Sequence, residues 1–121
     1  MPAAKYNMLV NQGEDYSLRL LFKDENGNPI NISTSTFEGQ IREKYDSTSI
    51  VASFSFVLGP STNEVFAKMS NVVTAAITCT PATNSNRRPL TEFIYDIEQT
   101  VSGVKTRILE GIVTVSPNVT R

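Results

Sequence analysis

The sequence contains no histidine and no tryptophan, and its one cysteine is Cys79. The absence of histidine excludes the commonest general base, the Ser-His-Asp and Cys-His nucleophile pairs and most zinc sites. A single cysteine cannot form a disulfide within the chain. Because no imidazole is present to activate its thiol, we interpret Cys79 as a small buried or half-buried residue. Together these absences exclude many classes of enzyme.

Clustered glycines and long apolar segments are missing too. The glycines occur singly, so they form no phosphate-binding loop; they are Gly13, Gly27, Gly39, Gly59, Gly103 and Gly111. The longest apolar stretch, Val72–Ile77, is interrupted by Thr74 and is far too short to span a bilayer. No sustained apolar segment follows Met1, so we expect no secretory signal and a protein that is made and assembled in a cytoplasm.

An excess of charge of either sign is also lacking. Eleven Lys and Arg residues stand against twelve Asp and Glu residues, which gives a net charge of -1. Binding to nucleic acid without sequence preference needs a basic face that makes several phosphate contacts. We therefore expect no nucleic-acid partner and, given the missing apolar segments, no membrane partner. We also expect no catalytic, cofactor-binding or metal-binding residues, no cofactor and no small-molecule substrate.

The clearest pattern in the chain predicts a β-hairpin. Residues 91–100 and 104–115 form two alternating runs joined by a turn that contains Gly103. From Ile108 onward apolar residues occur on both faces of the second run, which indicates a strand between two packed layers or against a neighbouring subunit. Ile108 and Ile112 are therefore candidate interface residues. Gly111, in mid-strand, favours a bulge or a close backbone approach.

The rest of the chain predicts further short strands separated by turns. With 121 residues it fits a single domain, residues 1–121, in which residues 1–5 form a loose tail or an assembly arm. Ser70 or Asn71 is placed to cap one short helix that runs to Ile77. The expected fold is an all-β antiparallel sandwich of Ig-like or Greek-key type, with about seven or eight strands and at most one short helix. Its other strands are expected near residues 6–10, 16–23, 37–42, 51–57 and 65–69.

Paired carboxylates are the remaining catalytic option, because glycoside hydrolysis needs only two of them. Asp96 and Glu98 are expected on one face of a strand, about 7 Å apart by strand geometry. Lys105 and Arg107 on the facing strand offer a simpler interpretation, in which the four side chains form cross-strand ion pairs on a solvated face. We favour the ion pairs.

The spacing Asp24-x-Asn26-x-Asn28 is similar to the start of a calcium-binding loop. The glycine, Gly27, stands at the fourth position of the motif rather than the sixth, and no glutamate stands at the twelfth. A hairpin turn is the favoured interpretation.

Exposed arginine and tyrosine side chains are the other candidates for contact. Arg87 and Arg88 lie in a polar segment, residues 80–89, that is either a solvated loop or a docking surface for a neighbouring subunit. Tyr45 and Tyr6 are flanked by polar residues, and either can serve as a partly exposed aromatic anchor.

Several segments of the chain also resemble a known kind of protein. The segments are Asn11–Asp15, Phe22–Ile30, Gln40–Arg42, Tyr95–Glu98, Thr106–Gly111 and Val113–Arg121. In this order they resemble small β-sandwich structural modules of tailed-bacteriophage virion proteins, of the tail, baseplate or fibre-attachment type. The matching positions are turn glycines, core aromatics and strand ends, so the resemblance implies a fold and a setting.

The resemblance implies a non-enzymatic structural protein of a tailed-phage virion, assembled in the bacterial host cytoplasm. Its partners would be other virion proteins, and it would form a homo-oligomer, a trimer or a hexamer, because virion positions are symmetric. One alternative is a capsid cement, decoration or neck protein, since the fold is the same at both locations. A further alternative, from another class, is a carbohydrate-binding module, although such sites usually present aromatic platforms.

Overall fold

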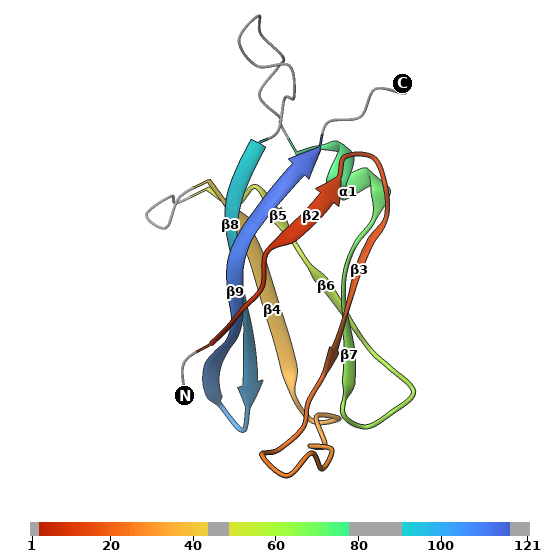
Figure 1. The fold of residues 1–121 in the computed structure, drawn as a ribbon, viewed down its shortest axis with the longest axis vertical. Helices are drawn as coiled ribbons and strands as arrows, with labels where there is room; N and C mark the ends of the chain where they lie inside the picture. The colour runs from red at the N-terminus through yellow and green to blue at the C-terminus, as the bar shows by residue number, and fades with distance from the viewer. Residues whose placement is uncertain (1–2, 44–48, 78–90, 117–121) are drawn as a thin grey trace, which may run out of the picture.

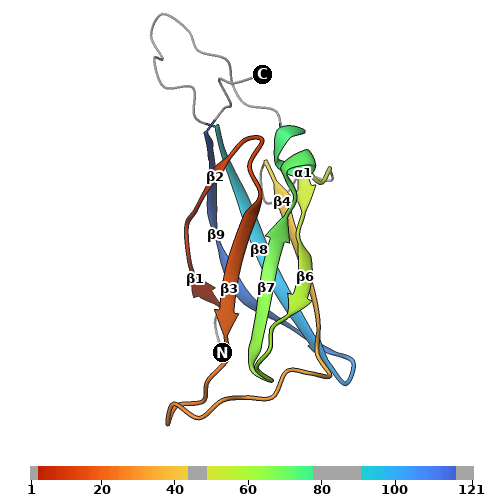
Figure 2. The same cartoon turned by 90° about the vertical axis from the view of Figure 1, so that its right-hand side faces the viewer.

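The computed structural model describes residues 3–43, 49–77 and 91–116, which form two β-sheets packed face to face (Figures 1 and 2). The large sheet contains β1 (Ala4–Lys5), β2 (Met8–Asn11), β4 (Thr36–Arg42), β5 (Ala52–Ser53), β8 (Thr91–Val101) and β9 (Val104–Ser116). The small sheet contains β3 (Tyr16–Leu21), β6 (Ser55–Leu58) and β7 (Glu64–Met69). A single short helix in the described residues, α1 (Asn71–Ala75), follows β7.

The strand order is that of an Ig-like sandwich. The large sheet runs β1-β9-β8-β4-β5, with β2 also along β9, and the small sheet runs β3-β7-β6. Neighbouring strands are antiparallel except β1 and β2, which pair with β9 in parallel. The predicted fold class, an all-β sandwich of Ig-like type with one short helix, is confirmed.

The core lies between the inner faces of the two sheets. On β8, Phe93, Tyr95 and Ile97 point inward, as the alternation predicts. Phe54 meets the Tyr95 ring edge-on, with ring centroids 6.0 Å apart. These aromatic side chains occupy the centre of a sandwich that has neither a tryptophan nor an intersheet disulfide.

The segment predicted as one strand over residues 51–57 changes sheets. β5 pairs with β4 in the large sheet, whereas β6 pairs with β7 in the small sheet. Phe54, between them, donates its N–H to the carbonyl of Gly39 at 2.9 Å. The prediction of a single strand is therefore wrong. Ala52, Phe54 and Phe56 all point toward the interior on both sides of the switch, so the alternation does not reveal it.

The predicted hairpin is confirmed as β8 and β9. Ser102 and Gly103 both have positive φ values, 49° and 82°, which a two-residue hairpin turn of type I′ requires. The register skips Ile108, because Ile97 faces Leu109 while Glu98 faces Arg107. The bulge is thus at Ile108 and not at Gly111.

Gly111 instead permits a close backbone approach, the other prediction for this position. A Cβ atom built on Gly111 would overlap the carbonyl oxygen of Tyr6. The Tyr6 N–H donates to the carbonyl of Glu110 at 3.0 Å, and the Tyr6 carbonyl accepts from the Tyr95 hydroxyl at 2.5 Å. The N-terminal strands are therefore held directly against the backbone of β9.

Helix α1 begins where the sequence predicts. The Ser70 hydroxyl accepts a hydrogen bond from the N–H of Val73, so Ser70 is the N-cap. The Thr74 hydroxyl is fully buried and donates to the carbonyl of Glu14 at 2.8 Å, which ties the helix to the turn before β3. No helix in the described part of the chain is long and apolar enough to cross a membrane.

Candidate functional site

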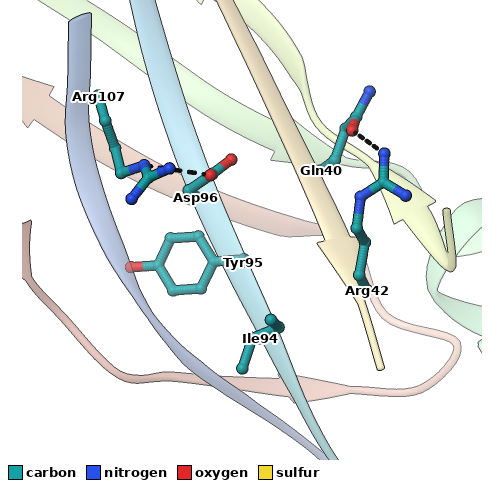
Figure 3. Close-up of a pocket in the computed structure, with 6 residues that line it drawn as sticks. All are labelled: Gln40, Arg42, Ile94, Tyr95, Asp96 and Arg107. Carbon is teal, nitrogen blue, oxygen red and sulfur yellow. Dashed lines mark hydrogen bonds and ion pairs between the residues drawn. The ribbon is translucent and has the colours of Figure 1, made fainter. Parts of the chain in front are cut away.

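The outer face of the large sheet holds four of the residues that the sequence singles out: Asp96, Glu98, Arg107 and Ile112. Residues directly opposite each other on neighbouring strands point to the same face of a sheet. Here Ile112 on β9 faces Ile94 on β8, and Ile94 in turn faces Arg42 on β4. A shallow hollow of about 140 Å³ opens on this face (Figure 3). It is lined by Gln40, Arg42, Ile94, Tyr95, Asp96 and Arg107.

An ion-pair cluster crosses this face and contributes Asp96 and Arg107 to the lining of the hollow. Arg107 Nε lies 3.3 Å from Asp96 Oδ2 (Figure 3). The Nη1 atom of Arg107 lies 3.8 Å from Glu110 Oε1. Asp96 and Glu110 are directly opposite each other, so Arg107 offsets the repulsion between their carboxylates. The predicted cross-strand ion pair is confirmed for Asp96 and Arg107. Lys105 faces Thr100 rather than either carboxylate.

Three apolar side chains lie beside this cluster and form what we call the apolar patch: Leu9, Ile94 and Ile112. Leu9 on β2 is 61% exposed and Ile112 is 40% exposed, while Ile94 is half-buried. Because Leu9 faces Thr114, two residues along β9 from Ile112, the patch extends across three neighbouring strands. Exposed apolar side chains that gather in this way are typical of contact surfaces.

The two isoleucines predicted as interface residues have different environments. Ile112 belongs to the apolar patch, whereas Ile108 is half-buried and packs against the core at the bulge. Tyr6 is 46% exposed beside β9. The other three candidates, Tyr45, Arg87 and Arg88, lie outside the described residues, as does Cys79.

The outer face of the small sheet is a second surface, which the sequence analysis did not assign. Phe66 on β7 lies between Arg19 on β3 and Val57 on β6, and the Lys68 ammonium lies 5.7 Å from the centre of its ring. Val57 is exposed, and so is Leu21, which follows Arg19 on the same face. Leu21 and Phe66, apolar residues on the polar side of their strands, were the signal in the sequence for this surface.

The buried carboxylate of Glu64 lies at one end of this second surface. Glu64 is almost fully buried, and its Oε2 accepts from Arg19 Nε in a short ion pair. Its other oxygen, Oε1, has no hydrogen-bond partner among the described residues. The carboxylate lies against Gly59, where an added Cβ would overlap Oε1. The exposed charges on the strands of this face are therefore those of Arg19 and Lys68.

The segment that resembles a calcium loop forms a turn. Asp24 Oδ1 accepts from the backbone N–H groups of Asn28 and Asn26, each at 2.9 Å, and these bonds lower the pKa of the Asp24 carboxyl. Lys23 and Pro29 are bridged across the turn, which confirms the predicted hairpin. Within the described residues, no three His, Cys, Asp or Glu side chains are grouped so that they could hold a metal ion.

Comparisons with known proteins give distant structural likenesses. No model of a known protein family matches the chain. No curated protein sequence matches it. The extracellular domain of the voltage-gated sodium channel β4 subunit is similar over 98% of this chain and 97% of its own, with 9% identity and a TM-score of 0.42. The three N-terminal domains of the highly immunogenic outer capsid protein (Hoc) of bacteriophage RB49 are similar over 95% of this chain and 37% of theirs, with 12% identity and a TM-score of 0.27.

The assignment of an Ig-like fold rests on the strand order of the two sheets. What this fold offers for function, in the residues that the structure describes, is two outer sheet faces that carry apolar and charged side chains together.

Proposed function

We propose that the chain is a non-enzymatic structural protein of a tailed-phage virion, where it docks in a tail, baseplate or fibre-attachment complex. The observation that carries the proposal is the apolar patch on the outer face of the large sheet, where Leu9 and Ile112 are exposed to solvent. Single exposed apolar residues are ordinary on a protein surface, but three that lie together across adjacent strands favour contact with another protein.

The surroundings of the patch also suit a protein interface. Asp96, Arg107 and Glu110 lie beside it and remain partly exposed. Protein interfaces commonly combine an apolar centre with a polar rim, and the rim charges fix orientation and partner choice more than affinity. Exposed ion pairs contribute about 0–1 kcal/mol each to stability. The ion-pair cluster is therefore better explained by a role in binding a partner protein than by a role in stabilising the fold.

The setting of the proposal comes from the sequence. The chain resembles virion modules over most of its length, including both arms of the β8–β9 hairpin and the turn at residues 24–29. In such particles identical chains occupy symmetric positions, so we further propose that the chain forms a trimer or a hexamer and contacts other virion proteins.

The location is tested on phage particles purified from a strain that carries the gene. Mass spectrometry of intact particles is expected to find the chain at a constant copy number, and antibody labelling in the electron microscope is expected to place it on the tail. Labelling over the capsid would favour the cement alternative. Abundant chain in the lysate but none in the particles would contradict the proposal.

The docking surface is tested by complementing a gene deletion with variants. Ile112→Arg puts a charge into the apolar patch and is expected to give folded protein that is lost from particles. Val104→Arg is the matched control, because Val104 is 66% exposed at the hairpin turn, away from the patch. Equal incorporation of the two variants would show that the patch is not the docking surface.

A further inference from the structure

The outer faces of the two sheets differ in charge. On the small sheet, which faces the viewer in Figure 2, the exposed charged side chains are Arg19 and Lys68, because Glu64 is buried. On β4, β8 and β9 of the large sheet the outward-pointing charged side chains are five carboxylates and three cations, so this face is net negative. They are Glu38, Glu92, Asp96, Glu98, Glu110, Arg42, Lys105 and Arg107.

Both faces also carry exposed apolar side chains beside these charges. On the small sheet they are Leu21 and Val57, with Phe66 half-buried between Val57 and Arg19. On the large sheet the apolar patch lies one row of residues from the carboxylates, because Ile94 precedes Asp96 by two positions on β8. Each face therefore combines an apolar part with a net charge, which is positive for the exposed side chains of the small sheet and negative for those of the large sheet.

We propose that the small-sheet outer face of one copy docks on the large-sheet outer face of a second copy of this chain. The inference rests on the proposed structural function and names one partner for it. In this contact Arg19 and Lys68 meet the carboxylates of the neighbour, and Phe66 and Val57 meet its apolar patch. Complementary charge and apolar area are then buried together.

The charges favour this contact between two different faces over a contact between two identical faces. Two large-sheet faces in contact would bring two net negative surfaces together, and two small-sheet faces would bring Arg19 and Lys68 against their own copies. Like charges placed together across an interface cost several kcal/mol, whereas opposite charges steer association. A contact between two different faces is heterologous, so it forms a closed ring if the rotation between copies closes and an open stack if it does not.

The size of the small-sheet face sets the strength of one contact. Three strands spaced about 4.8 Å apart and about six residues long cover roughly 300 Å². A stable interface buries about 800 Å² on each partner, so one contact alone is weak. Closure of a ring would make the last contact intramolecular and raise the overall affinity.

The test uses two variants, each with one face blocked. Ile112→Arg places a cation in the large-sheet face, where it would meet Arg19 and Lys68. Val57→Asp places an anion in the small-sheet face, where it would meet the carboxylates. Both positions are exposed, at 40% and 49%, so each variant is expected to give an amide NMR spectrum of a folded protein close to that of the wild type.

Each blocked variant alone is expected to be monomeric. When ¹⁵N-labelled Ile112→Arg is mixed with unlabelled Val57→Asp, the amide shifts are expected to change along β3, β6 and β7. With the labels exchanged, the shifts are expected along β4, β8 and β9. The complex is expected to have a one-to-one ratio, a Kd near or below about 1 mM, and an affinity that falls with added salt.

The control variant Val104→Arg lies outside both faces and is expected to self-associate like the wild type. Self-association of Val57→Asp alone would overturn the proposal in favour of contact between two large-sheet faces. Absence of shifts in the mixture, with both variants folded, would exclude the second copy as partner of these faces. Neither result would alter the location of the chain in purified particles, which tests the proposed function separately.

Discussion

At the residue scale, glycine at position 111 is required by a neighbouring strand segment and not by its own conformation. The Tyr6 carbonyl lies where a Cβ would stand, and the same carbonyl accepts the Tyr95 hydroxyl. We expect Gly111→Ala to lower the free energy of unfolding by about 1–3 kcal/mol, because the N-terminal segment must move away from β9. Urea unfolding measures the loss.

Gly27→Ala is the control variant for Gly111→Ala. Gly27 has a φ of 83° and nothing within 4 Å of an added Cβ, so its cost is local backbone strain of about 1–2 kcal/mol. Amide shifts at Tyr6 and Asn7 are expected in Gly111→Ala and not in Gly27→Ala. Unchanged shifts at both residues in Gly111→Ala would contradict the close approach.

The pair formed by Arg19 and Glu64 gives a second prediction at this scale. Arg19→Leu leaves the buried Glu64 carboxylate without its cation, and we expect a loss of about 1–3 kcal/mol, reduced because Arg19 itself is half exposed. The double variant Arg19→Leu/Glu64→Leu is expected to recover most of that loss, since no buried charge remains. A double variant less stable than the single one would contradict this account.

At the element scale, the segments that sequence predicts well are those whose signals are local. The β8–β9 hairpin follows from alternation and a Gly turn, and α1 follows from its cap at Ser70. The parallel pairing of β1 and β2 with β9 depends on residues about a hundred positions apart, which no local pattern reports. The bulge at Ile108 is likewise fixed by pairing register and leaves no mark in the composition.

The switch of sheets at Phe54 gives a prediction for an element. Phe54 is 7% exposed, contacts the rings of Phe56 and Tyr95, and lies where the chain passes from β5 to β6. We expect Phe54→Ala to cost about 3–5 kcal/mol, because it opens a cavity between the sheets. Ser55→Ala, at the adjacent exposed position, is expected to stay within about 0.5 kcal/mol of wild type. Equal losses of stability in the two variants would contradict a structural role for Phe54 where the chain changes sheets.

Tyr16 and Tyr95, which lie on strands of different sheets, predict how the stability of the fold depends on pH. Burial, together with the nearby Tyr6, raises the pKa of Tyr16 on β3 to about 12, and burial also raises the pKa of Tyr95 on β8. An unfolded tyrosine titrates near pH 10. Their raised pKa values therefore contribute stability that is complete below about pH 10 and is lost as pH rises toward 12.

The measurement is thermal unfolding followed between pH 8 and pH 12, with tyrosinate absorbance as the second signal. Tm is expected to be flat up to about pH 10 and then to fall. Tyr16→Phe, which keeps the ring and removes the ionisable hydroxyl, is expected to show a shallower fall. An alkaline decrease of the same steepness in Tyr16→Phe would contradict the assignment to Tyr16.

At the scale of the whole molecule, the fold was predictable and one of its two candidate surfaces was not. Ile112 was found from the sequence because an apolar residue on the polar side of a long strand is conspicuous. The small-sheet face was missed because Phe66 stands between Glu64 and Lys68, and charged neighbours on one strand suggest a solvated face. Only the structure shows that Glu64 is buried and that the remaining exposed charges there are cationic.

The two outer faces bear on one property of the molecule, its association with other copies of the chain. An Ig-like sandwich with apolar and oppositely charged outer faces is suited to contact its own copies. The small-sheet face limits the area of one contact, so assembly is expected to depend on concentration and on ionic strength.

We propose that this chain acts by assembling through its outer sheet faces. Light scattering on the purified protein, from micromolar to millimolar concentration, measures this assembly. The average mass is expected to rise above the 13.3 kDa of one chain with concentration, and to stay at 13.3 kDa in Ile112→Arg. A wild-type mass of 13.3 kDa at every concentration would contradict self-assembly through these faces.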